Sequence, residues 1–274
     1  MTLNSNWILQ QRDPSVIKLL MPVWEWLYRY YFRVKTDGWH HIPSQGQVLL
    51  VGSHNGGLAL PDMSMMMYDW FRRFGTERLI YGLSHQSVWT NHPYPFFTKL
   101  AMQVGAIPAT PRMAFAALKQ GSSLLVYPGG AKDLFRPYTQ RHQIHFAGQK
   151  GFIKLALQQE LPIIPLISKG AHDTLIVLGD LSEWIEPLRI WGFLGLFPEG
   201  LEVFPVYLGL PWGLAIGPLP NIPFPVQIHT RVCPPITFSR YGKEAAQDRA
   251  YVESCYWQVV NTMQAELDQL LAES

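Results

Sequence analysis

The amino-acid sequence predicts an α/β fold, in which a largely parallel mixed sheet is flanked by helices. Short apolar runs bounded by glycine and proline alternate with longer segments of helical periodicity. Buried strands that alternate with helices are typical of parallel sheets, because the crossover between two parallel strands is usually a helix. The 274 residues suffice to bury a substantial core, and no repeat or linker divides them, so we expect a single domain.

Composition limits the kind of surface and the kind of partner. Charged residues make up 15% of the chain and hydrophobic residues 48%, and ten residues are tryptophan. Soluble domains normally carry about a quarter charged residues, so this composition indicates exposed apolar surface and contact with membrane lipid. The alternative is a large aromatic core. The net charge of +2 argues against a nucleic-acid partner.

Three features that the sequence lacks bear on where in the cell we expect the protein to be. No basic start followed by an apolar core is evident at the N-terminus, so no secretory signal is expected. No uninterrupted apolar run is long enough to span a membrane. Cys233 and Cys255 fit a reducing compartment or core packing, and they lack the spacing of a metal site. We therefore expect no metal, and monotopic association with the cytoplasmic face of a membrane.

The first predicted element is an amphipathic helix over residues 16–31, crowded with tryptophan and tyrosine between scattered charges. Such a helix suits a lipid interface, and a helix packed across the domain is the equal alternative. Proline at a first helical position or glycine after a last one marks several further helices. The further predicted helices cover residues 61–74, 95–104, 111–120, 149–160 and 245–271, and the predicted strands cover residues 47–53, 79–83, 105–109, 123–127, 163–168 and 226–232.

Residues 190–225 differ from the rest of the chain. They are apolar, rich in proline and glycine, and carry only Glu199 and Glu202 as charges. Because the prolines forbid one straight membrane helix, we predict a hydrophobic, broken insert that contacts the membrane. The alternative is a long loop that covers the core.

His54, at the end of the first predicted strand, is the candidate general base, since a histidine pKa of about 6.5 lies near working pH. Asp62 is the nearby carboxylate that could fix the tautomer of the ring. In one continuous helix these residues would lie about 12 Å apart along the axis and on different faces, so the pair can form only if residues 55–60 form a loop that folds Asp62 back toward His54. Gly56 and Gly57 make such a turn easy and offer N–H groups to an oxyanion. The alternative is a structural histidine.

A second candidate site follows the predicted strand 123–127, at a strand end where open α/β sheets bind ligands. Its predicted substrate-binding residues are Tyr127, Pro128, Gly129, Gly130 and Asp133. The two glycines permit close approach of backbone to substrate, Asp133 could orient a polar group, and Lys132 or Arg136 could meet a phosphate. An ordinary turn is the alternative. Neither a phosphate loop nor a Gly-x-Ser-x-Gly nucleophile elbow occurs in the sequence.

Arg112 is a third candidate, because it lies in the first turn of the helix predicted after Pro111. An arginine at a helix start near a strand end could bind an anionic head group or a cofactor phosphate. The alternative is a solvated arginine.

These pieces, taken in order, resemble the glycerolipid acyltransferase superfamily, which includes lysophosphatidate acyltransferases and the more distant diacylglycerol and phytyl ester synthases. The first block of the family is a histidine, four residues and an aspartate. Here seven residues separate His54 from Asp62, which resembles a bacterial subgroup with a His-x-Gly-Gly pattern. The Tyr-Pro-Gly-Gly of residues 127–130 is similar to the Pro-Gly-Gly of the diacylglycerol branch, where phospholipid-making members carry Glu-Gly-Thr-Arg.

The likeness covers about residues 45–240. The Gly-Ala-Ile-Pro of residues 105–108 resembles the second block and leads to Arg112, which the resemblance implies contacts the head group of the acceptor. The Lys-Gly-Phe of residues 150–152 and the Pro-Ile-Ile-Pro of residues 162–165 resemble the fourth.

The resemblance implies an O-acyltransferase that moves a fatty acyl group from acyl-CoA or acyl carrier protein to a lipid hydroxyl, with His54 as base and no cofactor. A lysophospholipid, diacylglycerol or another glycerolipid, or a long-chain alcohol would be the acceptor, and the missing block arginine weakens the case for a phosphorylated one. Residues 1–45 would form a membrane-contacting helix, 46–240 the catalytic core and 241–274 a C-terminal helix. A lipid esterase or thioesterase and a non-catalytic lipid-binding protein are the alternatives, and the oligomeric state stays open.

Overall fold

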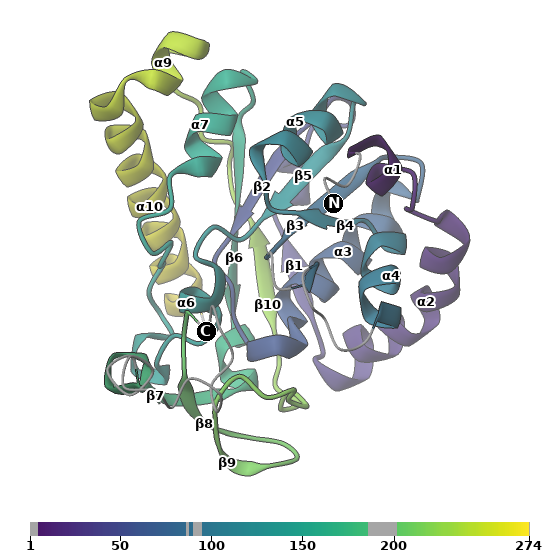
Figure 1. The fold of residues 1–274 in the computed structure, drawn as a ribbon, viewed down its shortest axis with the longest axis vertical. Coiled ribbons are helices and arrows are strands. Elements are labelled where there is room, and N and C mark those ends of the chain that lie inside the picture. Colours follow the sequence, from purple (N-terminus) through teal and green to yellow (C-terminus); the bar gives the residue numbers. More distant parts are fainter. Residues whose placement is uncertain (1–4, 86–87, 90–94, 186–201, 274) are drawn as a thin grey trace.

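The computed structural model describes residues 5–85, 88–89, 95–185 and 202–273, which form two β-sheets and the helices around them (Figure 1). The main sheet has seven strands in the order β1-β10-β6-β2-β5-β3-β4. The strands from β6 to β4 run parallel to one another, whereas β10 is antiparallel to β6 and parallel to β1. The predicted α/β fold with a largely parallel mixed sheet is thus confirmed.

The strands of the main sheet are short. In chain order they are β1 (Lys35–Asp37), β2 (Leu49–Gly52), β3 (Ile80–Ser84), β4 (Ala106–Pro108), β5 (Ser123–Val126), β6 (Ile163–Lys169) and β10 (His229–Val232). Every strand predicted from the sequence lies in this sheet, with its ends displaced by a few residues. β1 was not predicted.

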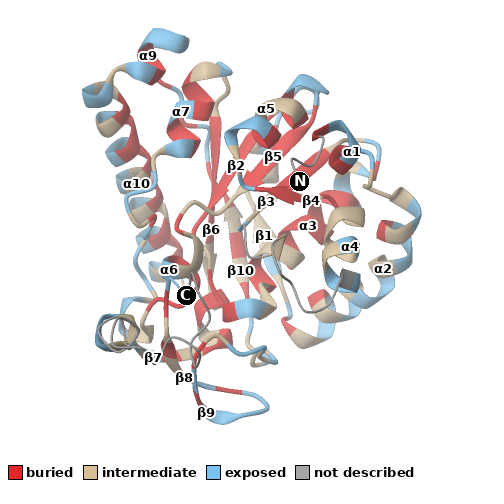
Figure 2. Ribbon diagram, in the orientation of Figure 1, coloured by how far each residue is buried: buried red, intermediate tan, exposed pale blue. Residues whose placement is uncertain are grey.

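Helices cover both faces of the main sheet, and the buried residues follow the strands between them (Figure 2). In β2, Leu49 and Val51 pack on one face and Leu50 on the other, because successive side chains of a strand alternate. The first face is covered by α1 (Ser5–Leu9), α5 (Pro111–Lys119), α7 (Gly151–Gln158), α9 (Lys243–Gln247) and α10 (Arg249–Ala272), and the second by α2 (Pro14–Trp26) and α3 (Pro61–Phe74). In addition, α4 (Pro95–Gln103) lies beside β4, and α6 (Gly130–Leu134) follows β5.

Two predicted helices differ from the observed ones. The helix predicted over residues 16–31 is α2, capped by the Asp13 side chain, and a π-helical turn at Leu27–Tyr31 follows it. The helix predicted over residues 245–271 is divided into α9 and α10 at Asp248, whose side chain accepts a hydrogen bond from the Tyr251 amide and so caps α10. Among the described residues, no helix has the length and apolarity that a membrane crossing requires.

A second sheet of three antiparallel strands lies below the main sheet in Figure 1. Its strands are β7 (Ile176–Asp180), β8 (Pro205–Gly209) and β9 (Gly213–Ile216). The insert predicted over residues 190–225 was expected to be hydrophobic and broken. Residues 190–201 lie outside the described residues, and the remainder contains β8 and β9, two short strands that the sequence analysis did not predict.

The order of the strands defines the edge at which polar side chains meet. β5, β2 and β6 are neighbours and run parallel, so their carboxyl ends lie side by side. His54 follows β2, the segment 127–133 follows β5, and His172 follows β6. Open α/β sheets bind their ligands at such an edge.

Candidate active site

The loop after β2 folds back on itself within eight residues. Gly56 and Gly57 have φ angles of 84° and 65°, in the left-handed region that favours glycine. Gly57–Ala59 form one 3₁₀ turn, after which Leu60 also has a positive φ of 49° and Pro61 begins α3. The loop expected between His54 and the acidic residue of this helix is therefore present.

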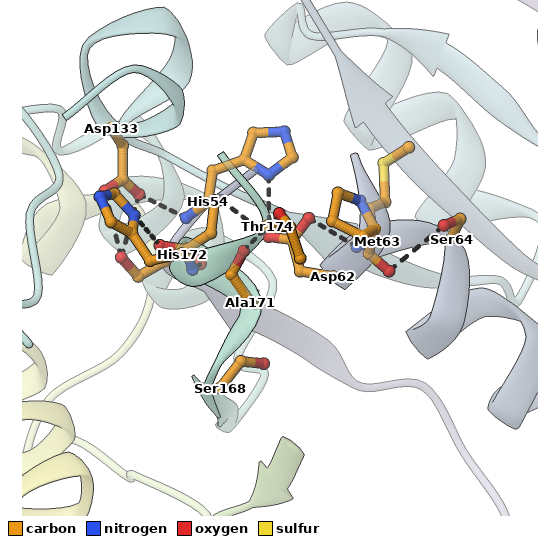
Figure 3. Close-up of polar contacts among 12 residues, drawn as sticks. His54, Asp62, Met63, Ser64, Asp133, Ser168, Ala171, His172 and Thr174 are labelled. Atoms are coloured by element: carbon orange, nitrogen blue, oxygen red, sulfur yellow. Dashed lines mark hydrogen bonds and ion pairs between the residues drawn. The ribbon is translucent and has the colours of Figure 1, made fainter. Parts of the chain in front are cut away.

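This loop brings His54 and Asp62 into direct contact (Figure 3). The distance from His54 Nδ1 to Asp62 Oδ2 is 3.0 Å, and the same oxygen accepts a hydrogen bond of 3.0 Å from the Asn55 amide. The other carboxylate oxygen accepts from the Met63 amide at 2.8 Å. Because Asp62 lies in the first turn of α3, its charge is also favoured by the helix dipole.

The surroundings of His54 prepare its ring to accept a proton. Burial lowers the pKa of His54, but the charge and hydrogen bond of Asp62, with a smaller contribution from Asp133, outweigh this effect and raise the pKa above its usual 6.5. With a proton on Nδ1 shared with Asp62, Nε2 is the nitrogen with a free lone pair. The side chain retains 11% exposure, so the ring is accessible from one side.

Tyr127 packs directly on the ring of His54. The two ring centroids are 4.4 Å apart and the planes are inclined by 23°, which is a stacked arrangement. Gly52 permits this contact, because a Cβ at that position would lie 2.4 Å from the Tyr127 ring. Burial, together with the charges of Asp62 and Asp133, raises the pKa of Tyr127 well above its usual value, so the phenol stays neutral.

Asp133 lies on the other side of His54 from Asp62 (Figure 3). Its carboxylate accepts hydrogen bonds from the His54 amide and from Ser53 Oγ, and it forms an ion pair with Arg136. Asp133 is fully buried and Arg136 is 2% exposed. We predicted that Asp133 could orient a polar group and that Arg136 could meet a phosphate, but in the structure each is occupied by the other and by the His54 loop.

The glycine pair after Tyr127 serves two different purposes. A Cβ on Gly129 would lie 2.4 Å from the Cβ of Asp133 and 2.5 Å from the His145 carbonyl oxygen, so this glycine is required by packing. Gly130 has a positive φ of 56°, and a Cβ there would meet nothing within 4 Å. Close approach of a substrate to the backbone is therefore open at Gly130, and Pro128 beside the pair is partly exposed.

Arg112 stands apart from this cluster. It lies in the first turn of α5 and its side chain is exposed. β4, which precedes α5, is three strand positions from β2, or about 14 Å at the usual strand spacing. Arg112 therefore lies at the same edge of the sheet as His54 but is not brought next to it.

Four polar side chains around His54 were not predicted as site residues: Ser53, Asn55, His172 and Asn221. Asn55 Oδ1 lies 2.7 Å from His172 Nδ1, and Asn221 Nδ2 donates to the Gly56 carbonyl oxygen at 3.3 Å. His172 could have been found by its place just after β6, since that strand end adjoins β2. Asn221 carries no signal in the sequence, because its approach to Gly56 depends on the tertiary fold.

Within the described residues, no group of three or more histidine, cysteine, aspartate or glutamate side chains is placed to hold a metal ion. Cys233 and Cys255 are buried and unpaired with each other. The contact of His54 Nδ1 with Asp62 permits proton transfer at Nε2 of His54, beside backbone N–H groups of a glycine-rich turn.

Known proteins match the sequence of this chain. Residues 33–169, half of the chain, match the family described as Acyltransferase. An uncharacterized protein of Mycobacterium tuberculosis is 26% identical over 93% of this chain and 66% of its own length. Diacylglycerol O-acyltransferase 2 of Xenopus laevis is 24% identical over 85% of this chain and 64% of its own length. The chain thus spans about two thirds of the length of these curated relatives.

Two further proteins are similar to this chain, one in sequence and one in structure. Phytyl ester synthase 1 of Arabidopsis thaliana is 28% identical over 52% of this chain and 20% of its own length. The crystal structure of the 1-acyl-sn-glycerophosphate acyltransferase from Thermotoga maritima covers 98% of this chain and 81% of its own, with 15% sequence identity and a TM-score of 0.47.

Proposed function

Since the chain belongs to the acyltransferase family, we propose that it transfers a fatty acyl group from the thioester of acyl-CoA or acyl carrier protein to the hydroxyl of a lipid. The observation that carries this proposal is the contact of His54 with Asp62, which leaves Nε2 of a histidine with a raised pKa at the end of a parallel strand. A thioester transfer by this route needs no covalent enzyme intermediate.

In the proposed reaction, His54 Nε2 removes the proton from the acceptor hydroxyl as its oxygen attacks the thioester carbonyl. Asp62 stabilises the imidazolium that forms. When the tetrahedral intermediate collapses, the carbon–sulfur bond breaks, the imidazolium returns the proton to the sulfur, and the ester and the free thiol leave. The histidine is then neutral again and ready for another turnover.

The loop after β2 would also supply donors for the oxyanion. The amide N–H groups of His54 and Asn55 already donate to Asp133 and Asp62. In the part of the chain that the structure describes, the Gly56 and Gly57 amides have no such acceptor. We propose that these two N–H groups donate hydrogen bonds to the developing oxyanion. Each such donor typically lowers the activation barrier of acyl transfer by about 3 kcal/mol.

The His54→Ala variant tests this assignment. We expect it to remain folded and to lose acyl transfer by a factor of about 10²–10⁴ or more, measured with acyl-CoA and a panel of lipid alcohols. His40→Ala is the matched control, because His40 is exposed and lies on a different segment. Near-normal turnover by the His54 variant would contradict the proposal, and release of free acid alone, with or without lipid alcohols, would favour a thioesterase.

We propose a neutral lipid hydroxyl, such as that of diacylglycerol or a long-chain alcohol, as the acceptor. The buried guanidinium beside His54, that of Arg136, is neutralised by Asp133, and Arg112 lies several strands away. Diacylglycerol O-acyltransferase 2 and phytyl ester synthase, which the chain resembles, support the same choice. Turnover with a lysophospholipid that exceeds turnover with every neutral alcohol in the panel would refute it.

Two apolar surfaces support membrane attachment as part of this proposal. On α2, Leu19, Val23 and Trp26 are 75%, 57% and 53% exposed and recur at the spacing of one helix face. In the small sheet, Leu208 and Leu214 are cross-strand partners, and both are exposed. Since the segment 203–228 contains no charged residue, this surface suits a lipid interface.

Trp26→Glu and Trp257→Glu form a matched pair for testing attachment. Both tryptophans are about half exposed, but Trp257 lies on α10, on the opposite side of the main sheet from α2. We expect only the Trp26 variant to bind liposomes more weakly in co-sedimentation. Equal binding by both variants, or a wild-type chain that ignores liposomes, would refute attachment through α2.

A further inference from the structure

A cluster of five buried polar side chains surrounds the backbone of His54. Its members are Ser53, Asn55, Asp133, Arg136 and His172, each of which is at most 8% exposed. They come from the ends of three neighbouring strands: two from the loop after β2, two from the α6 region after β5, and one from the turn after β6. The cluster therefore joins the segments that meet at the edge where the base lies.

Asp133 is the centre of this cluster, and all its contacts are with donors. Ser53 Oγ donates to both of its oxygens at 3.1 Å, the His54 amide donates to Oδ2, and Arg136 Nη1 pairs with Oδ1. Burial raises the pKa of Asp133 to about 7, against the lowering effects of Arg136 and these hydrogen bonds. Because every neighbour donates, the ionised carboxylate is the form that satisfies all of them.

Asn55 connects this pair to the third strand. Its side-chain Nδ2 donates to the Ser53 carbonyl oxygen at 2.9 Å, which fixes the orientation of the amide. Its Oδ1 then faces Arg136 Nη2 at 3.4 Å and His172 Nδ1 at 2.7 Å, while His172 Nε2 lies 3.0 Å from the Arg136 carbonyl oxygen. Burial and the charge of Arg136 lower the pKa of His172 to about 4, so the ring is neutral at neutral pH and its single N–H can donate to only one of these two oxygens.

The cluster thus includes both chain neighbours of His54, while the His54 ring itself points to Asp62 (Figure 3). The same ring stacks on Tyr127. A buried ion pair is a poor way to gain stability, because desolvation of the two charges offsets their attraction. The hydrogen bonds of this network do, however, connect three strand ends and so fix the geometry of the backbone they contact, although among the described residues Arg136 Nε has no partner.

We propose that Asp133 and Arg136, together with Asn55 and His172, are positioning residues that hold the His54 main chain so that its ring meets Asp62 on one side and substrate on the other. This proposal rests on the proposed role of His54 as the base. It gives a function to buried ionisable groups that do not touch the reacting atoms.

The test compares Asp133→Asn with the double variant Asp133→Asn/Arg136→Gln. The double variant removes both charges, so it does not leave a buried guanidinium without its partner. Two experiments are made. NMR titration of imidazole resonances, assigned with the His54→Ala spectrum, gives the His54 pKa, and steady-state assays give the kcat and KM of acyl transfer. Fluorescence or circular dichroism melting reports the folded fraction.

Asp69→Asn is the matched control. Asp69 is also fully buried and pairs with the arginine three residues later, Arg72, but it lies two turns along α3 from Asp62. We expect this variant to lose stability while its His54 pKa stays at the wild-type value, since Asp69 is not among the groups that shift that pKa.

For the double variant we expect a lower His54 pKa, since Asp133 contributes to raising it, and a kcat reduced by roughly tenfold or more at little-changed KM. A folded double variant with wild-type kcat would overturn the proposal. So would failure of both variants to fold, or an activity loss that only follows the folded fraction as in Asp69→Asn. The NMR titration of His54 needs no substrate. It therefore still tests the positioning proposal if the proposed acyl-transfer activity is wrong.

Discussion

Two buried carboxylates flank His54 and hold it in different ways. Asp62, from the first turn of α3, contacts ring nitrogen Nδ1 and the amide of the next residue. Asp133, from α6, contacts the amide of His54 itself and is paired with Arg136. The first is adjacent along the chain through a glycine turn, whereas the second arrives from the neighbouring strand.

The difference teaches that burial and proximity alone do not make a carboxylate part of the chemistry. Only Asp62 shares a proton with the ring, so only Asp62 can stabilise the imidazolium directly. Asp133 has no free oxygen for a ring or a substrate, since its contacts are taken by the backbone, Ser53 and Arg136. We therefore expect substitutions at the two sites to separate chemistry from positioning.

The largest separation is expected for Asp62→Asn. An amide preserves the shape of the side chain but cannot stabilise an imidazolium, and it can leave the ring in the wrong tautomer. We expect kcat to fall by about 10²–10⁴-fold while residual transfer remains, measured in initial-rate assays with saturating acyl-CoA. An unchanged kcat would mean that a different acid orients His54.

The pH dependence of kcat/KM should also distinguish the roles of Asp62 and Asp133. As the proposed base, His54 must be neutral, so we expect activity to fall as pH drops through the His54 pKa, which is raised above 6.5 in the wild-type protein. Asp62→Asn removes the main cause of that increase while burial remains, so the acidic limb should move to lower pH. Asp133→Asn should also move the acidic limb to lower pH, but by a smaller amount than Asp62→Asn.

A profile that does not move in Asp62→Asn would show that the acidic limb belongs to another group. A larger displacement in Asp133→Asn than in Asp62→Asn would reverse the roles assigned to the two carboxylates. Both profiles are best taken with the same acyl donor and checked against the NMR titration of the ring.

The smallest effect is expected for Tyr127→Phe. The Tyr127 ring stacks on His54 at 4.4 Å, and the substitution keeps that ring. Since its phenol stays neutral, we expect kcat to change by less than about threefold, with the acidic limb in place. A loss as large as that of Asp62→Asn would mean that the hydroxyl takes part in the reaction.

Much of the main sheet could be predicted because its strands are apolar runs between glycine or proline. β1 was missed because only three residues pair, and their burial shows no core-facing pattern. β8 and β9 were missed for a different reason. Tyr207 and Ala215 are buried on one face, but Leu208 and Leu214 are exposed and equally apolar on the other, so the usual alternation of a strand is absent.

The candidate site was predictable where it is local in sequence. The spacing of His54 and Asp62, with a glycine pair between them, predicted that the two residues could meet only through a loop, and the structure has that loop. The contact of Asp133 with the His54 amide could not be predicted, because it depends on β5 lying beside β2. His172 likewise reaches Asn55 only because β6 is the other neighbour of β2.

The position of β1 has a consequence for folding during synthesis on the ribosome. β1 pairs with β10 alone in the main sheet, and Arg231 reaches Asp37 across 194 residues of sequence. At roughly 5–20 residues per second, about 10–40 s of synthesis separate the two strands. The exposed apolar face of α2 is synthesised before that interval begins, so the face proposed to bind a membrane is complete well before β1 can pair with β10.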